Sequence, residues 1–128
     1  MVIARDDRVF GAHRRIVLEW ALDGAGQYAQ VIDGDAGPQY CFGRPGRLFD
    51  QIGPVVASDD DSARALVSES LRAADGRSVV VDAYDRHGGF SGWLRSLGFN
   101  ASRPLFRMRR GAWHGESSER AILGPEFG

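Results

Sequence analysis

The chain has 128 residues, of which 43% are hydrophobic, and a formal net charge of −1. This length predicts a single domain over 1–128, and the apolar content excludes a disordered chain. No apolar run reaches the roughly 18 residues that a membrane span needs, and the charge gives no reason to expect nucleic acid as a partner. The N-terminus lacks a signal-peptide pattern and Cys41 is the single cysteine. We therefore expect no disulfide and a cytoplasmic location.

The first half of the chain predicts one helix followed by three strands. Apolar residues at i, i+4 spacing favour a helix over 11–22, within a lead-in of 1–26. β-forming residues predict strands over 27–32, 39–43 and 48–57. The turn residues at 33–35 make a hairpin of the first two strands. Pro54 cannot donate to a strand ladder, so it predicts a bend in the third.

The second half predicts two more helices and further strands. The clearest helix runs over 60–74, with its apolar residues on one face and Ser58 or Asp59 as its N-cap. A second, over 89–97, places Phe90, Trp93, Leu94 and Leu97 on one face, and Gly98 follows it. Strands are predicted over 78–83 and 104–109, with a short one over 121–123.

This order of elements predicts a mixed α/β (α+β) fold. A strand, a crossover helix and then a buried strand imply a parallel pair at the centre of an otherwise largely antiparallel sheet. Helices should then cover both faces of that sheet. We expect the core over 27–110 and a C-terminal tail over 111–128.

Five short sequence islands resemble the GNAT-type N-acetyltransferases, and in particular the C-terminal domain of tandem, YitH-like acetyltransferases. They are Phe10-Gly11-Ala12-His13-Arg14, Tyr40-Cys41-Phe42-Gly43-Arg44-Pro45-Gly46, Ile52-Gly53-Pro54-Val55-Val56-Ala57, Leu97-Gly98-Phe99 with Arg103 and Arg107-Met108, and Gly124-Pro125-Glu126-Phe127-Gly128. The resemblance implies a GNAT-like fold, shortened at its N-terminal side. It also implies transfer of an acetyl group from acetyl-CoA, as cosubstrate, to an amine.

The resemblance also implies where acetyl-CoA would bind. In this family the backbone of the bent strand holds the pantetheine arm, which here means Val55, Val56 and Ala57. Arg64, in the following helix, is a candidate contact for the pyrophosphate. The acceptor is expected to be a small-molecule amine or a protein N-terminus.

Two residues near the predicted cleft are candidates for proton transfer. Asp82 could act as a base, and the alternative is a cap or turn acceptor at a strand end. Tyr84 could donate a proton or contact substrate, and the alternative is simple packing. The three histidines lie far apart with no ligand spacing, so we expect no metal.

Some features favour a domain that has lost catalysis and serves in binding or dimerisation. The family's glycine-rich pyrophosphate loop corresponds here to 58–64, which has no glycine and contains Asp59, Asp60 and Asp61. Leu94 stands where the family usually has its general-acid tyrosine. Because a shortened N-terminal side should leave apolar surface or sheet edge uncovered, we also expect a homodimer.

Overall fold

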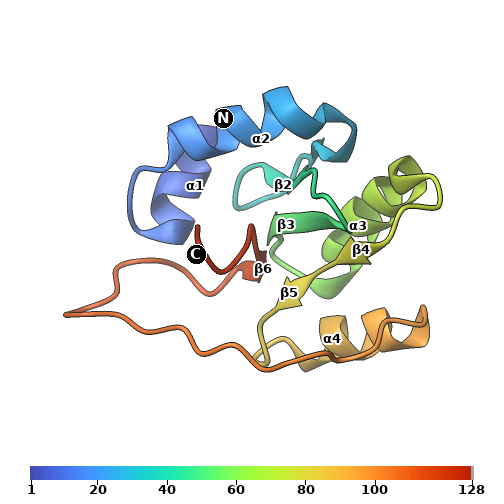
Figure 1. Cartoon of the computed structure of the whole chain (residues 1–128). Helices are drawn as coiled ribbons and strands as arrows, with labels where there is room; N and C mark the ends of the chain where they lie inside the picture. Colours follow the sequence, from blue (N-terminus) through green and yellow to red (C-terminus); the bar gives the residue numbers. More distant parts are fainter. Residues whose placement is uncertain (128) are drawn as a thin grey trace.

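The computed structural model describes residues 1–127 and contains four α-helices, one short 3-10 helix and six strands (Figure 1). The helices are α1 (Val2–Phe10), α2 (Arg15–Ala25), the 3-10 helix η1 (Gly26–Tyr28), α3 (Asp60–Ala74) and α4 (Gly88–Ser96). The strands are β1 (Gln30–Ile32), β2 (Gln39–Arg44), β3 (Asp50–Val56), β4 (Val79–Val80), β5 (Asp82–Ala83) and β6 (Glu119–Ile122).

The strands form one mostly antiparallel sheet in the order β1-β2-β3-β6-β5, with β4 also paired to β3. The β3–β4 pair is parallel, and the other pairs are antiparallel. This arrangement confirms the predicted mixed fold, the hairpin of the first two strands and the central parallel pair. The predicted strand over 78–83 forms as two short pieces, β4 and β5, with different partners.

The sheet buries a separate apolar cluster on each face, because successive side chains of a strand point to opposite sides. Cys41 and Val55 belong to the cluster under α3 and α4, whereas Tyr40, Phe42 and Val56 belong to the cluster under α1 and α2. Helices therefore cover both faces, as predicted.

The N-terminal region departs from the single helix predicted over 11–22. It forms two helices, and Gly11 lies between them with a φ of 82°, a left-handed conformation that ends α1. The i, i+4 pattern found α2, but α1, which carries four charged residues among its nine, falls within the predicted lead-in. Its apolar side, with Val2, Ile3 and Val9, packs in the cluster under α1 and α2. The second helix brings Arg14 next to Asp6 of the first, which matters below.

The bent strand β3 changes its neighbour halfway along. Its first residues, Asp50 and Gln51, pair with β4, whereas Val55 and Val56 pair with β6. Its ladders with β2 and with β6 both shift register along this stretch, consistent with the predicted bend. As a result β6 lies between β3 and β5, in the opening that the divergence of β3 and β4 creates (Figure 1).

The segment between α4 and β6 is the largest difference from the sequence prediction. The strand predicted over 104–109 does not form, and every residue from 100 to 114 is exposed. Phe106 and Met108 are 86% and 90% exposed. Figure 1 shows this part of the chain looping away from the sheet before it returns to β6. The alternating pattern predicted a strand, but no neighbouring edge pairs with it.

The other predicted helices form close to their expected bounds. α3 matches its predicted range, and the Asp59 side chain accepts a hydrogen bond of 2.7 Å from the Ser62 backbone N–H, as an N-cap does. In α4 the core side chains are Phe90 and Leu94, with Trp93 partly buried against them. Leu97 is 50% exposed, so its assignment to the core face was wrong.

Candidate functional site

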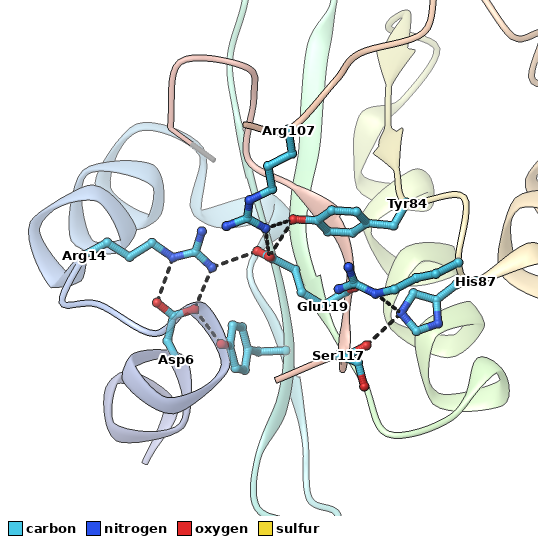
Figure 2. A network of polar contacts seen from close by, with 9 residues as sticks. Asp6, Arg14, Tyr84, His87, Arg107, Ser117 and Glu119 are labelled. Carbon is cyan, nitrogen blue, oxygen red and sulfur yellow. Dashed lines mark hydrogen bonds and ion pairs between the residues drawn. The ribbon is translucent and has the colours of Figure 1, made fainter. Parts of the chain in front are cut away.

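Several charged and phenolic side chains gather around Glu119 at the start of β6 (Figure 2). We call this set the Glu119 cluster. Its members share hydrogen bonds or ion pairs and come from six parts of the chain; they are Asp6, Arg14, Tyr40, Tyr84, Arg107 and Glu119. Asp6 and Glu119 are only 1% and 2% exposed, so the cluster holds two buried carboxylates.

Arg14 joins these two carboxylates. Its Nε and Nη2 donate to the two oxygens of Asp6, each at 2.8 Å, and Nη2 also donates to Glu119 Oε1 at 3.0 Å. The Tyr40 hydroxyl donates to Asp6 at 2.6 Å. Burial opposes the charge on Arg14, but the hydrogen bond to Asp6 and the charges of both carboxylates raise its pKa above the ordinary value. This bridge ties the N-terminal helices to β6 and fixes the orientation of Glu119.

Tyr84 lies just after β5 and faces the second oxygen of Glu119. Its backbone N–H donates to the Arg120 carbonyl at 2.9 Å, which extends the β5–β6 ladder by one residue. Its hydroxyl donates to Glu119 Oε2 at 3.2 Å. Burial and then the charge of Glu119 raise the pKa of Tyr84 to about 12, so the phenol keeps its proton at neutral pH.

Arg107 covers this pair from the exposed segment. Its Nη1 lies 3.5 Å from Glu119 Oε2 and donates a hydrogen bond to the Tyr84 hydroxyl. The guanidinium also lies over the rings of Phe10 and Tyr84, at 5.6 and 5.7 Å from their centroids. Figure 2 shows the Arg107 side chain reaching toward Glu119 and Tyr84 from the side opposite Asp6.

Asp82, the other candidate for proton transfer, lies in β5 two residues before Tyr84. Its carboxylate accepts a hydrogen bond of 3.0 Å from Gln51 Nε2. That contact links β5 to β3, which is a structural role other than the cap or turn acceptor named as the alternative. Its assignment as a base stays a prediction, but Glu119 is better placed for proton exchange with Tyr84.

Val55, Val56 and Ala57 lie where the bent strand meets β6. Val55 and Val56 pair with β2 on one side and with β6 on the other, and the Ala57 N–H donates to the Ser118 carbonyl at 3.0 Å. In this conformation the backbone groups that the resemblance assigns to the pantetheine arm are already hydrogen-bonded.

The beginning of α3 is similarly occupied by the chain's own side chains. Asp59 accepts from Ser62, and Asp60 pairs with Arg120 at 3.2 Å. Arg64, the predicted pyrophosphate contact, lies 3.8 Å from Asp61, and its buried Nε has no hydrogen-bond partner among the described residues. These carboxylates stabilise the helix end but repel a pyrophosphate. The residues present therefore do not fit the bound cosubstrate in this conformation.

Other candidate chemistry is weaker. Cys41 is fully buried, and burial raises its pKa to about 12, so it is an unreactive core thiol. Within residues 1–127 no group of three or more His, Cys, Asp or Glu side chains could hold a metal ion. Among the helices described, none has the length and apolar character to cross a membrane.

The sequence analysis found Tyr84 but missed Glu119, Asp6 and Arg14. Arg14 ends one of the recognised islands, yet nothing in its local sequence says that it bridges residues 8 and 105 positions away. Glu119 lies in a stretch that was predicted as tail. No local pattern in that stretch distinguishes Glu119 from its charged neighbour Arg120.

A comparison with family models places the chain in a known class. A family model described as an acetyltransferase (GNAT) domain matches residues 2–124, which is nearly the whole chain. The chain therefore belongs to the GNAT acetyltransferase family, whose members generally use acetyl-CoA as cosubstrate. Neither a curated protein nor a solved structure shows significant similarity to it. The finer resemblance to the C-terminal domain of tandem, YitH-like enzymes is not confirmed.

Proposed function

We propose that the chain transfers an acetyl group from acetyl-CoA to an amine, with Glu119 and Tyr84 as its proton-transfer pair. Membership of the GNAT family supports the reaction class. The observation that carries the assignment of residues is the 3.2 Å contact between the Tyr84 hydroxyl and a carboxylate oxygen that Arg14 holds in place from its other side.

The chemistry of this pair suits the acceptor side of the reaction. An amine arrives in water as an ammonium ion and must lose a proton before its nitrogen can attack a carbonyl carbon. Glu119 Oε2 can hold the ammonium and accept that proton. Tyr84 keeps its proton at neutral pH and can give it to a leaving group. The thioester itself would come from acetyl-CoA, and the acceptor is a small-molecule amine or a protein N-terminus.

A second function is favoured by the contacts of the residues that the resemblance assigns to acetyl-CoA. β6 pairs with the backbone of Val55 and Val56, and three aspartates lie at the beginning of α3. A domain that never opens this region would serve as a binding or dimerisation module of the same fold. For such a module we also propose the homodimer that is expected from the sequence.

Two measurements separate these functions. Isothermal titration of the purified chain with acetyl-CoA tests whether the cosubstrate binds at all. Radiolabelled acetyl-CoA, incubated with the chain and a panel of amines and N-terminal peptides, tests transfer. Binding and transfer that fall in Tyr84→Phe support the enzyme. Absence of both, for a folded chain at millimolar acetyl-CoA, supports the binding module.

A further inference from the structure

We propose that Glu119, Tyr84 and Phe10 form a binding site for an alkylammonium or alkylguanidinium group, and that Arg107 is an exchangeable internal occupant of this site. The inference rests on the proposed function only for the role of the site as the acceptor side of acetyl transfer. The occupancy itself follows from contacts, charge and exposure of residues described above.

The contacts of Arg107 are those that recognise a cation. Glu119 supplies a negative charge, the Tyr84 hydroxyl accepts a hydrogen bond, and the rings of Phe10 and Tyr84 lie within the range of cation–π attraction. A neutral or anionic group gains little from this combination. A primary ammonium or guanidinium on a short alkyl stem satisfies all of it.

The ion pair with Glu119 favours a cation at this position. Asp6 and Glu119 carry two formal negative charges, and Arg14 supplies one positive charge between them. Arg107 is the second cation in contact with Glu119. Arg86 and Arg14 also lie against the two rings, 4.0 Å from the Tyr84 centroid and 3.9 Å from the Phe10 centroid, so the direct pair with Glu119 and not the overall charge makes the preference. A cation that replaces Arg107 gains this preformed counter-charge.

Arg107 is held in a way that permits exchange. Its ion pair with Glu119 is long, at 3.5 Å, and its side chain is 38% exposed. The residues on either side, Phe106 and Met108, point into solvent and provide no packing that would fix the backbone. An external cation competes with Arg107 for Glu119. Arg107 has a high local concentration because it belongs to the same chain, but its contacts are weak.

Exchange of Arg107 would determine which amines bind and when Glu119 and Tyr84 become accessible. Amines with a flexible cationic end, such as short alkylamines, diamines and side chains like those of lysine and arginine, should enter in place of Arg107. The guanidinium then moves out with the exposed segment, and its departure opens Glu119 and Tyr84 to solvent.

Removal of the internal occupant tests this directly. Arg107→Ala, Arg107→Lys and Arg110→Ala are compared with the unaltered chain by isothermal titration with ethylguanidine and its neutral isostere ethylurea. Arg110 lies in the same exposed segment and has no hydrogen bond or ion pair among the described residues, so it is a matched control. We expect Arg107→Ala to bind ethylguanidine at least about tenfold more tightly than the unaltered chain. Arg107→Lys and Arg110→Ala should resemble the unaltered chain, and ethylurea should bind none of them.

Thermal unfolding of the same proteins gives a second readout if Arg107→Ala is destabilised. Ethylguanidine should then raise its Tm at millimolar concentration, whereas ethylurea should not. Equal responses to the two probes, or equal affinity of Arg107→Ala and Arg110→Ala for ethylguanidine, would overturn the proposal.

The proposed function can fail separately. Acetyl transfer to butane-1,4-diamine is measured with the unaltered chain and with Arg107→Ala. If Arg107→Ala gains ethylguanidine binding but neither protein transfers acetyl, the cation site stands and the enzyme assignment fails. If acetyl is transferred but Arg107→Ala gains no binding, the enzyme assignment stands and Arg107 is not an occupant.

Discussion

The two ends of the central strand β3 carry clusters built from the same three kinds of side chain. At its beginning, the Asp50 cluster consists of Asp50, Tyr28 and Arg77: the Tyr28 hydroxyl and the Arg77 guanidinium both donate to the Asp50 carboxylate. At its end, the Glu119 cluster places Tyr84 and Arg107 on a glutamate. Both carboxylate side chains are 2% exposed.

The clusters differ in how firmly the arginine is held. Arg77 contacts both oxygens of Asp50, at 2.8 and 2.9 Å, and also donates to the Gly46 carbonyl. Tyr28 is fully buried beside it. Arg107 has one long ion pair with Glu119 and one hydrogen bond to the Tyr84 hydroxyl, and it comes from an exposed segment. Tyr84 is only half-buried. The comparison indicates that one set of residue types can close a structure or provide a site. The bonding of the arginine decides which, because the Arg77 side chain is more exposed than that of Arg107, at 51% against 38%.

The largest effect should come from the bridge that only the Glu119 cluster has. Arg14→Ala leaves Asp6 and Glu119 buried without their shared cation, and we expect it to lower the free energy of unfolding by about 3–5 kcal/mol. Arg15→Ala is the matched control, because its pair with Glu19 is exposed and screened by solvent, so its loss should leave the free energy of unfolding almost unchanged. Urea unfolding of both variants checks this. A loss below about 1 kcal/mol in Arg14→Ala would show that the bridge does not hold the helices to β6.

The Asp50 cluster should affect how the free energy of unfolding falls as the pH becomes acidic. Hydrogen bonds from Arg77 outweigh burial and lower the pKa of Asp50 to about 2. A carboxyl whose pKa is lower folded than unfolded stabilises the protein above its unfolded value, near 3.9, and loses that contribution as pH falls toward 2. We expect a loss of about 2 kcal/mol over this window. Denaturant unfolding between pH 5 and 2 should show it, and Arg77→Gln should flatten the curve. An unchanged curve in Arg77→Gln would mean that the pair is not formed.

A smaller effect separates the two tyrosines. Tyr28→Phe removes a fully buried hydroxyl from a buried carboxylate, and we expect it to cost about 1–3 kcal/mol. Tyr84→Phe removes a half-buried hydroxyl whose carboxylate keeps Arg14 and Arg107, so the cost should be under about 1 kcal/mol. Urea unfolding of both variants measures the difference. Equal losses in the free energy of unfolding would contradict the proposed difference between the Asp50 cluster and the Glu119 cluster.

The sequence predicted the parts of the fold that depend on local pattern. The helix over 60–74, the hairpin and the bent strand all follow from spacing, turn residues and Pro54, and the structure contains each of them. The strand expected over 104–109 has the right residues but no partner edge, and pairing cannot be read from one segment. Tyr84 was found because it lies two residues after Asp82 and was expected to share its face toward the cleft. Glu119 was missed because its neighbours Arg14 and Tyr84 become neighbours only through the fold.

The rate of acetyl transfer in matched tyrosine variants tests the central claim most directly. Tyr84→Phe and Tyr28→Phe each remove one hydroxyl from a buried carboxylate at opposite ends of β3. We predict that Tyr84→Phe lowers the rate of transfer from labelled acetyl-CoA to butane-1,4-diamine by about 10²-fold or more, since general acid catalysis contributes on that order. Tyr28→Phe should stay within a few-fold of the unaltered chain, measured well below its Tm. Equal rates in the two variants, or no transfer by the unaltered chain, would contradict the assignment of Tyr84 and Glu119 as the reacting pair.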